Sequence, residues 1–433
     1  MRILIIGASG LIGSAIAARL SAQGHRIVGV ARHAHRTYRT FSALGAIEWA
    51  TVDISRAVDA SSWRPLLKDI DAVINVAGTL QDSPSESTEG VHVTGISALY
   101  EACQQENVAK VIHFSAIGAD RGATQFSRSK QRGEQALASS DLNWIILRPS
   151  VVIGRSAYGG SALLRSLAAL PVLPVMPGTG KLQPVHLDDV VETIPILLKP
   201  DAPSRQILDV VGPRRYEFPD LVDVFRRWMR WRPARRFELP AWAATLLYRL
   251  GDAAVVLGWK PPVRSTAQRE MHFGAVGDPK PWEQATGLKA RDIEHELMRE
   301  PASVQERWFA RLYVPKPLVF AVFGAFWIVT GLISLGPGWE IGTSYVREGG
   351  LGPTVAAAAT IAGALADIAI GLAILYRPTA RYGLYAALLI SIAYAIIGTI
   401  LVPGLWIDPL GPMLKIFPIM AFNLVALAIV DDR

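Results

Sequence analysis

Cysteine, metal-ligating histidine and charge are all scarce in this 433-residue sequence, and each scarcity excludes a class of protein. Cys103 is the only cysteine, so we expect a core residue, no intramolecular disulfide and a reducing compartment. The eight histidines are scattered without metal-ligand spacing, which predicts no metal site. Charged residues make up 19% of the chain and hydrophobic residues 51%. This apolar balance predicts that part of the chain sits in lipid.

The charged residues that are present are unevenly distributed along the chain. They fill roughly the first three quarters and become scarce after Lys316, so the composition marks a boundary between a polar part and an apolar part. A chain of this length is too long for one compact core. We predict three domains, over residues 1–215, 216–312 and 313–433.

The amino terminus carries a strand, a glycine-rich turn and a helix in that order. A β-branched run over residues 2–6 precedes Gly7, Gly10 and Gly13, and a helical pattern follows over residues 14–24. Glycines let a pyrophosphate approach the amides and the positive dipole at the start of a helix. The motif predicts a dinucleotide site, although the glycines could also serve only tight strand–helix packing. They interrupt the apolar run, which argues against a signal peptide and predicts a cytoplasmic amino terminus.

The second predicted strand, residues 25–31, lacks the acidic residue that NAD-dependent dinucleotide folds place near its end. Arg32 stands there instead, with Arg36 and Arg39 close behind. Guanidinium groups form charge-assisted hydrogen bonds with phosphate. The pattern therefore favours NADP(H) over NAD(H), and the alternative is a solvated basic loop.

Strand patterns recur further along the chain, with helical segments between most of them. They cover residues 47–54, 71–78, 110–118 and 143–154. This alternation predicts an α/β fold with a doubly wound parallel sheet. Ligands bind at the carboxyl ends of the strands in such sheets, and four residues fall at these ends: Asp53, Gly78, Ser115 and Pro149.

These stretches together resemble the short-chain dehydrogenase/reductase superfamily in its extended and atypical branches. The resemblance is greatest to the group that includes the NADPH-binding Rossmann subunit of respiratory complex I. It covers about residues 1–215 and rests on the motifs GASGLIG, FSRSK, LRPSVVIG and QPVHLDDVV in this order.

The resemblance implies a role for particular residues of this sequence. The pyrophosphate would be held by Gly7, Ser9, Gly10, Leu11, Ile12 and Gly13, and the adenosine phosphate by Arg32. Asp53 and Ile54 would lie near the adenine, and Ala77 and Gly78 against the inner ribose. Lys130 would bond the nicotinamide ribose, while the nicotinamide would be lined by Pro149, Ser150 and Val152. Ser115 matches the serine that orients a substrate carbonyl.

Phe126 departs from the family pattern, because the family has its catalytic tyrosine at this position. In that chemistry the phenol passes a proton to or from the substrate oxygen, and Lys130, one helical turn later, lowers the pKa of the phenol. Phenylalanine keeps the ring and loses an acid that typically contributes about 10²- to 10⁴-fold. Three groups could replace this acid: a water on Ser115, a cofactor hydroxyl near Lys130, or a substrate such as a quinone or flavin that takes its proton from solvent. The other interpretation is a binding domain that has lost catalysis.

Two residues near the predicted site have ambiguous roles. Tyr158 lies in a loop and could supply a phenol from outside the helix. His92 stands near a position where relatives often have an asparagine. It either acts on a substrate or is a capping or partly buried histidine, and we expect the second.

Residues 216–312 fit the helical substrate lobe of an extended reductase. A short stretch crowds six arginines without an acid: Arg226, Arg227, Arg230, Arg232, Arg235 and Arg236. We interpret them as a surface that attracts anionic lipid headgroups rather than nucleic acid, with a solvated helix face as the alternative. Residues 239–259 are apolar, but Arg249 and Asp252 argue against a membrane span. We expect a packed helix there, with an interfacial helix or a lid as alternatives.

Four apolar segments follow, each about long enough to cross a bilayer. They cover about residues 317–336, 352–376, 379–402 and 411–430. Basic residues concentrate on one side, whereas the outer loops hold Arg347 alone. Those on the first side are Arg307, Arg311, Lys316, Arg377 and Arg381. This asymmetry predicts an inner-membrane protein with both chain ends in the cytoplasm. The span count and character resemble the DoxX-like four-helix membrane domain.

Asp367 is an ionisable residue near the middle of the second apolar segment, on a face of small residues. Such a carboxyl should face other helices, and Asn423 is a better placed partner than Lys415. The residue predicts either a quinone or proton site or a buried structural hydrogen bond.

The sequence thus predicts a membrane-anchored NADP(H)-dependent oxidoreductase that acts on a lipophilic or quinone-like substrate. Its partners would be the bilayer and a membrane protein, not nucleic acid. The alternative is a non-catalytic NADP(H)-binding module of a membrane complex. A sugar-nucleotide epimerase would need the missing tyrosine.

Overall fold

The computed structural model describes residues 1–32, 47–84 and 86–431, and these form two compact units. The first comprises Met1–Asp252 and Pro261–Ala310, and the second comprises Ala253–Lys260 and Arg311–Arg433. Each unit has its own hydrophobic core. The predicted division near residue 215 concerns a boundary inside the first unit and stays a prediction.

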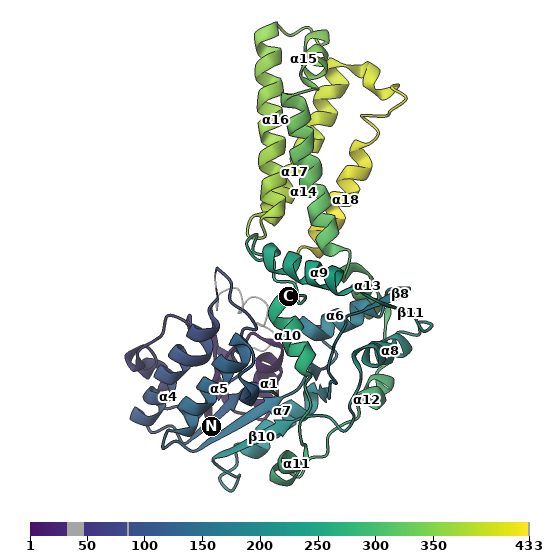
Figure 1. Ribbon diagram of the computed structural model, residues 1–433. Helices are drawn as coiled ribbons and strands as arrows, with labels where there is room; N and C mark the ends of the chain where they lie inside the picture. Colours follow the sequence, from purple (N-terminus) through teal and green to yellow (C-terminus); the bar gives the residue numbers. More distant parts are fainter. Residues whose placement is uncertain (33–46, 85, 432–433) are drawn as a thin grey trace. The chain divides into compact units, whose positions relative to one another are not determined.

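A seven-stranded parallel sheet forms the centre of the first unit (Figure 1), which confirms the predicted α/β doubly wound fold. The strands are β1 (Arg2–Ile6), β2 (Arg26–Ala31), β3 (Ile47–Thr51), β4 (Ala72–Asn75), β5 (Lys110–Phe114), β6 (Trp144–Pro149) and β10 (Gln206–Val210). Their order is β10-β6-β5-β4-β1-β2-β3. The order reverses between β1 and β4, where folds of this kind bind ligands beyond the strand ends. The edge strand β10 was not among the predicted strands.

Alternate side chains of each strand pack into separate cores on the two faces of the sheet. In β1, Leu4 and Ile6 enter one core while Ile3 and Ile5 enter the other, as the two-residue period of a strand requires. The first core lies under α3 (Arg64–Leu67), α4 (Gly95–Gln105) and α5 (Gln125–Ala138). The second lies under α1 (Leu11–Ala22), α7 (Leu187–Leu197) and α11 (Lys280–Thr286).

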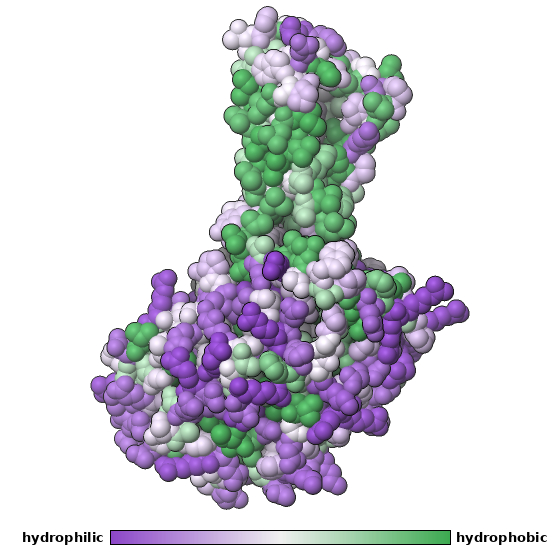
Figure 2. Space-filling model, viewed as in Figure 1, coloured by the Kyte–Doolittle hydropathy of each residue, from purple (hydrophilic) through white to green (hydrophobic). Residues whose placement is uncertain are grey.

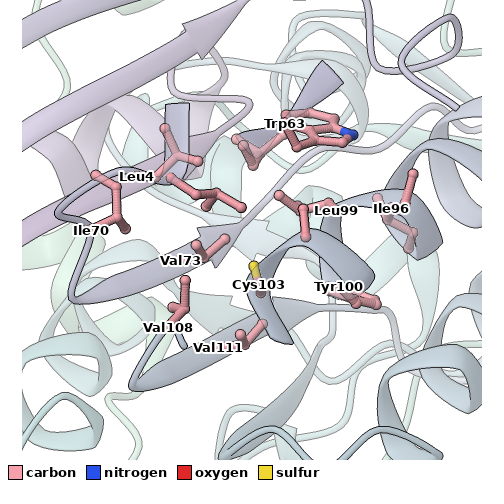
Figure 3. Packing of buried hydrophobic residues seen from close by; sticks show 14 of the residues in the cluster. Leu4, Trp63, Ile70, Val73, Ile96, Leu99, Tyr100, Cys103, Val108 and Val111 are labelled. Atoms are coloured by element: carbon pink, nitrogen blue, oxygen red, sulfur yellow. The ribbon is translucent and has the colours of Figure 1, made fainter. Parts of the chain in front are cut away.

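Cys103 is a core residue, as predicted. It is buried in the first core, where Figure 3 shows it among Leu99, Val108 and Val111. Burial raises the pKa of its thiol to about 12, so the sulfur is protonated and unreactive at neutral pH.

A third core supports a smaller lobe within the first unit. Its elements are β7 (Val152–Ile153), α6 (Gly159–Leu167), β8 (Val172–Val175), β9 (Val185–His186), α8 (Phe218–Trp228), β11 (Arg235–Glu238), α10 (Ser265–Phe273), α12 (Ile293–Arg299) and α13 (Val304–Tyr313). The helix α9 (Ala241–Ala254) covers most of the apolar stretch whose role the sequence left open.

Three of the six arginines in the arginine-rich stretch bind other parts of the protein and do not form the open basic surface that the sequence predicted. Arg226 is buried, and its guanidinium donates to the carbonyl oxygens of Ala168 and Leu170 at 2.6 Å each. Arg227 and Arg236 pair with carboxylates of other helices or turns, at 2.7 Å from Glu294 in the first case. For these three arginines the prediction was wrong, because these partners lie outside the arginine-rich stretch. Arg230, Arg232 and Arg235 are exposed, and for them a surface that attracts headgroups stays a prediction.

The second unit consists mainly of apolar helices. They are α14 (Lys316–Leu335), α15 (Trp339–Glu348), α16 (Pro353–Leu375), α17 (Ala380–Leu401) and α18 (Ile416–Ile429). Among the described residues, α14, α16 and α17 are long and apolar enough to cross a membrane, with 20, 23 and 22 residues. Figure 2 shows hydrophobic side chains along their outer surface.

The fourth predicted span is shorter than the sequence suggested. α18 has 14 residues, and at 1.5 Å per residue it is about 21 Å long, less than the roughly 30 Å of a hydrocarbon core. Residues 407–415 do not form a helix, because Pro409 and Pro412 lack an amide donor and Gly411 is left-handed with φ +59°. The prediction of a helical span from residue 411 was therefore wrong.

The end of α18 nevertheless returns to the start of the first span. The Val430 carbonyl accepts hydrogen bonds from Lys316 Nζ at 3.4 Å and from the Arg377 guanidinium at 2.8 Å. Arg381 pairs with Asp431. Of the basic residues that the sequence assigned to one side, Lys316, Arg377 and Arg381 thus gather at one end of this unit, and the side of the membrane stays a prediction.

Asp367 is buried within the second unit and has a partner that the sequence did not suggest. Its Oδ1 accepts a hydrogen bond from the Tyr394 hydroxyl at 2.9 Å. Asn423, the expected partner, donates instead to the Leu384 carbonyl at 3.0 Å. The expectation was wrong because helical spacing fixes depth but not which neighbouring helix a face meets.

Candidate functional site

The glycine turn between β1 and α1 is shaped by close backbone packing. Gly7 is left-handed with φ +80°, and a Cβ there would come within 3.0 Å of the Ala77 backbone. A Cβ on Gly13 would lie 2.3 Å from the Gly7 carbonyl oxygen. At Gly10 a Cβ would meet only that oxygen at 3.4 Å. Gly7 and Gly13 are thus required for packing, while Gly10 leaves open space beside the first turn of α1, whose amides have no intrahelical partner.

The carboxyl end of β4 connects this turn to a buried lysine. Lys130 Nζ donates to the carbonyl oxygens of Ala77 at 3.3 Å and Phe114 at 2.9 Å. A Cβ on Gly78 would lie 3.3 Å from the same nitrogen. Gly78 itself is exposed, so the ammonium group lies directly beneath backbone that a ligand can reach.

Burial lowers the pKa of Lys130 to about 8. The carboxylate of Glu134, one turn further along α5, acts in the opposite direction and offsets only part of the effect. Glu134 is itself buried and forms a two-pronged ion pair with Arg148, at 2.8 and 2.6 Å. The sequence analysis missed this pair, although a carboxylate four residues after the lysine is a signal that was available.

Phe126 occupies the second position of α5. Thr124 caps the helix by accepting a hydrogen bond from the Ser127 amide at 3.1 Å. Phe126 and Lys130 therefore lie one turn apart on one face, as predicted. The Phe126 ring is half-buried and packs edge-on against the ring of His92, with centroids 5.7 Å apart.

His92 is fully buried rather than at a helix cap. It lies in a π-helical turn, η3 (Gly90–Thr94). Its Nε2 accepts from the Thr79 amide at 3.0 Å, so the proton of the neutral ring lies on Nδ1 and donates to Ser129 Oγ at 2.8 Å. Burial lowers the pKa of His92 well below its usual value, and the charge of Lys130 lowers it further. His92 therefore ties the loop at Thr79 to α5 and stays neutral.

Ser115 follows β5 directly. Its amide donates to the Leu147 carbonyl at 2.8 Å. Its Oγ is buried and has no hydrogen-bond partner among the described residues. A buried hydroxyl without a partner costs about 1–3 kcal/mol, and such groups need an explanation.

Arg32, at the end of β2, already has a partner. Its guanidinium lies 2.6 Å from a carboxylate oxygen of Glu86, whose other oxygen accepts from the Thr79 hydroxyl at 3.2 Å. No sequence pattern indicated Glu86 as the partner, because it is distant along the chain. Arg36 and Arg39 lie outside the described residues.

The remaining predicted residues lie at the same edge of the sheet, and two of their side chains have structural partners. Asp53 Oδ1 accepts from the amide and the hydroxyl of Ser55, at 3.1 and 2.7 Å. Ser150 donates its hydroxyl to the Ala275 carbonyl at 3.0 Å. The rest follow β3, end β6, begin β7 or begin α1: Ile54, Pro149, Val152, Ser9, Leu11 and Ile12. Tyr158 precedes α6 and is 39% exposed.

A second buried polar cluster lies on β4, α4 and β5. His113 Nδ1 meets the Tyr100 hydroxyl at 2.9 Å and the Asn75 amide at 3.1 Å. Asn75 Oδ1 in turn accepts from the Ala77 amide at 3.1 Å. The cluster thus fixes the backbone that touches both Gly7 and Lys130, and sequence analysis missed it because its members come from three separate elements.

Two family descriptions match this chain. Residues 7–163 match a family described as NAD(P)H-binding. Residues 324–424 match the DoxX-like family.

Curated relatives match about half of this chain. The NADH-ubiquinone oxidoreductase 40 kDa subunit of Neurospora crassa is 28% identical over 226 residues, which is 51% of this chain and 58% of that protein. The ceramide reductase of Caulobacter vibrioides is 26% identical over 191 residues, 43% of this chain and 57% of the relative. The chain therefore spans little more than half the length of each.

Solved structures share the fold of the first unit. Bordetella bronchiseptica WbmG in complex with NAD superposes with a TM-score of 0.53 at 18% identity, covering 69% of this chain and 92% of WbmG. MoeE5 in complex with UDP-glucose and NAD gives a TM-score of 0.51 at 18% identity, covering 72% of this chain and all of MoeE5, 100%. At this identity the likeness concerns the fold alone.

Proposed function

Because the chain joins an NAD(P)H-binding Rossmann domain of the short-chain dehydrogenase/reductase type to a DoxX-like domain, we propose that it is a membrane-anchored NADP(H)-dependent oxidoreductase. We further propose that it acts on a lipophilic or quinone-like substrate. The observation that carries the proposal is the position of Ala77 and Gly78, which contact both the glycine turn and the Lys130 ammonium group.

The residues at this edge fit a nicotinamide dinucleotide. The open space at Gly10 and the amides that begin α1 suit a pyrophosphate. Lys130, beneath the exposed Gly78 backbone, suits a ribose hydroxyl. The same proposal assigns the adenine to Asp53 and Ile54, and the nicotinamide to Pro149, Ser150 and Val152.

The chain's own groups would do the following work. The bound dinucleotide supplies a hydride equivalent. Ser115 Oγ, which has no partner among the described residues, would hold the substrate oxygen. Phe126 has no proton to give, so the proton that accompanies the hydride would reach that oxygen from solvent or through Ser115. A substrate that accepts its proton from water fits this arrangement better than an ordinary ketone does.

A lipophilic substrate is supported by the membrane helices and by relatives. A catalytic domain tethered to a bilayer meets a lipid-soluble substrate at a high effective concentration. One relative is named a ceramide reductase, and another is a subunit of NADH-ubiquinone oxidoreductase. We propose that the first unit faces the cytoplasm from the inner membrane, since Lys316, Arg377 and Arg381 gather at one end of the membrane helices.

A second function is favoured by Phe126. A domain that has kept its cofactor site and lost the tyrosine could bind NADP(H) without turnover and stabilise a membrane complex. Full-length protein in lipid nanodiscs, titrated with NADPH and then offered carbonyl-bearing lipids and quinones, separates the two functions. Oxidation that a Gly10→Val variant lacks supports the enzyme. Saturable NADPH binding with no oxidation by any acceptor supports the binding module.

A further inference from the structure

Helix α9 has two apolar faces, and only one of them packs against protein. Ala244, Tyr248 and Gly251 form its buried face. On the opposite side, Trp242, Leu246 and Leu250 are 71%, 50% and 58% exposed. Their spacing of four residues places them in one stripe along the helix. A helix on the surface of a soluble domain normally turns a polar face outward, so this stripe calls for a covering.

The chain that continues from α9 lies at the ends of membrane helices. Trp259 Nε1 donates to the carbonyl of Leu375, the last residue of α16, at 2.8 Å. The Trp259 ring packs on Phe320, in the first turns of α14, with centroids 4.8 Å apart. The amide of Arg377 donates to the Leu257 carbonyl at 2.8 Å. Residues 253–260 are therefore part of the membrane unit.

These contacts set the depth of the segment in a bilayer. The guanidinium of Arg377 lies 5.3 Å from the centre of the Trp259 ring. Lys316 reaches the same end of the helices through its bond to the Val430 carbonyl, which Arg377 shares. Tryptophan with lysine and arginine at the ends of spans marks the headgroup layer. α9 ends where this segment begins, and its 14 residues extend only about 21 Å.

We propose that α9 is an interfacial helix whose stripe of Trp242, Leu246 and Leu250 is immersed in the boundary between headgroups and acyl chains of the same bilayer. Arg249, also exposed, borders the stripe and suits anionic headgroups. The arrangement makes α9 a second, peripheral membrane contact beside the spans.

The docked helix is bonded to a loop beside the proposed cofactor site. Asp252, near the end of α9, accepts from the Gln81 side chain at 2.9 Å and pairs with Arg264 at 3.6 Å. Arg264 donates to the Asp82 carbonyl at 2.8 Å. Gln81 and Asp82 follow Thr79, the residue that His92 holds. The docking would thus keep this loop next to the lipid surface, and a role in delivering a lipid substrate rests on the proposed function.

Nitroxide labels on the full-length chain test the docking itself. Cys103→Ala removes the only cysteine, after which single cysteines are introduced as Leu246→Cys or Leu250→Cys. The matched controls are Thr245→Cys on the neighbouring face, Gln104→Cys on α4 and Leu389→Cys on the outer surface of α17, where Leu389 is 69% exposed. The protein is placed in vesicles of phosphatidylcholine with phosphatidylglycerol.

The measured quantity is the ratio of the collision rate with oxygen to that with a water-soluble nickel chelate. We expect this ratio to be several-fold higher for the labels at 246 and 250 than for the label at 104, and to approach the ratio at 389. A ratio equal to that at 104 would overturn the proposal. Low collision with both reagents would also overturn it, since the stripe would then be covered by protein.

A kinetic arm separates docking from catalysis. Leu246→Glu combined with Leu250→Glu should raise KM for a bilayer-dissolved substrate several-fold. The affinity of this variant for NADPH, and the KM of the control Thr245→Glu, should stay near the values of the unaltered protein. An unchanged KM would overturn the delivery role. If no lipid substrate is turned over by the unaltered chain, the proposed function fails and the label result stands by itself.

Discussion

At the scale of single residues, the ring of Phe126 and the ammonium group of Lys130 lie one turn apart on α5. Lys130 is buried, and its ammonium group donates to the backbone carbonyl oxygens of Ala77 and Phe114. The hydroxyl that it would activate is absent. The proposed site therefore has a buried lysine without the proton donor that the family resemblance implies.

Restoring that hydroxyl should restore ordinary carbonyl reduction. We expect Phe126→Tyr to create or raise carbonyl reductase activity, because the phenol would stand one turn from Lys130, whose positive charge lowers the pKa of a phenol. A positioned acid contributes about 10²-fold or more. NADPH affinity should change little. The measurement is the rate of NADPH oxidation with a panel of carbonyl compounds.

Phe126→Leu is the control, since it removes the ring without adding an acid. A large loss of NADPH binding in Phe126→Tyr would show that the residue lies elsewhere than we infer. An unchanged rate with every carbonyl compound would count against Ser115 and Lys130 as the rest of a reductase site.

Lys130 should also give the protein a distinctive dependence on pH. Its pKa is about 8 in the folded protein against an ordinary value of 10.5, so between these values the unfolded chain binds more protons. The free energy of unfolding then rises with pH across this window, by at most on the order of 3 kcal/mol. The cost of burying the charge is fully present below pH 8. In Lys130→Met this rise should vanish.

Thermal unfolding of the detergent-solubilised protein and of Lys130→Met, measured from pH 8 to 10.5, tests this. The difference in Tm between the two proteins should move in favour of the unaltered chain as the pH rises. Parallel pH profiles would mean that the lysine keeps its proton throughout.

We expect the choice of dinucleotide to depend on Arg32 and Glu86. Glu86 already pairs with the guanidinium group of Arg32, which would have to bind the 2′-phosphate of NADP(H). We expect Glu86→Gln to raise affinity for NADPH relative to NADH, and Arg32→Ala to lower NADPH affinity about tenfold or more, as loss of a charge-assisted bond implies. Fluorescence titration with both nucleotides measures this. A preference for NADH that Arg32→Ala leaves unchanged would favour NAD(H) as the cofactor.

Sequence could identify the candidate residues better than their partners. The glycine turn, Lys130 and Ser115 stand in short motifs or directly after a strand, so local patterns place them. Glu86 beside Arg32 is a contact that only the folded chain brings together. The carbonyls that bind Arg226 lie 56 and 58 residues away. Sequence spacing carries no information on such contacts.

At the scale of elements, two glycines of the β1–α1 turn have different roles: Gly13 is needed for close packing, and we expect Gly10 to leave room for the ligand. We expect Gly13→Ala to lower Tm and abolish nucleotide binding, because its Cβ would lie 2.3 Å from the Gly7 carbonyl oxygen. Gly10→Ala should keep Tm, since its Cβ has ordinary van der Waals room, and yet weaken NADPH binding. Thermal unfolding and calorimetry on the same samples measure both.

Gly160→Ala is the matched control, because a Cβ there meets nothing within 4 Å. It should change neither quantity. If Gly10→Ala binds NADPH as tightly as the unaltered chain, the open space at this turn does not hold the pyrophosphate.

The elements themselves were predictable where their pattern is strong. The strands β1, β2, β4, β5 and β6 are mostly buried, and helices of strong pattern lie between most of the described strands. β10 was missed because it is an edge strand with exposed residues at Gln206 and Ile207. The helix α18 is shorter than its apolar run because Pro409, Gly411 and Pro412 interrupt the helical backbone before it. Hydropathy alone does not reveal this effect.

At the scale of the whole molecule, the course of α18 predicts the topology. Its end meets Lys316 and Arg377, so the carboxyl terminus should lie on the same side of the membrane as residues 311–316. Green fluorescent protein fused to either terminus should fluoresce in cells, because it folds only in the cytoplasm. Fluorescence from one fusion alone would show that the two ends lie on opposite sides of the membrane and would contradict this topology.

The central claim is that a nicotinamide dinucleotide binds at the glycine turn of a membrane-held domain. Calorimetric titration of the full-length protein in lipid nanodiscs with NADPH and NADH tests it most directly. We predict saturable heat at one site per chain for at least one nucleotide, and much weaker binding by the Gly10→Ala variant, whose Cβ has ordinary van der Waals room. A folded chain that takes up neither nucleotide would contradict the claim.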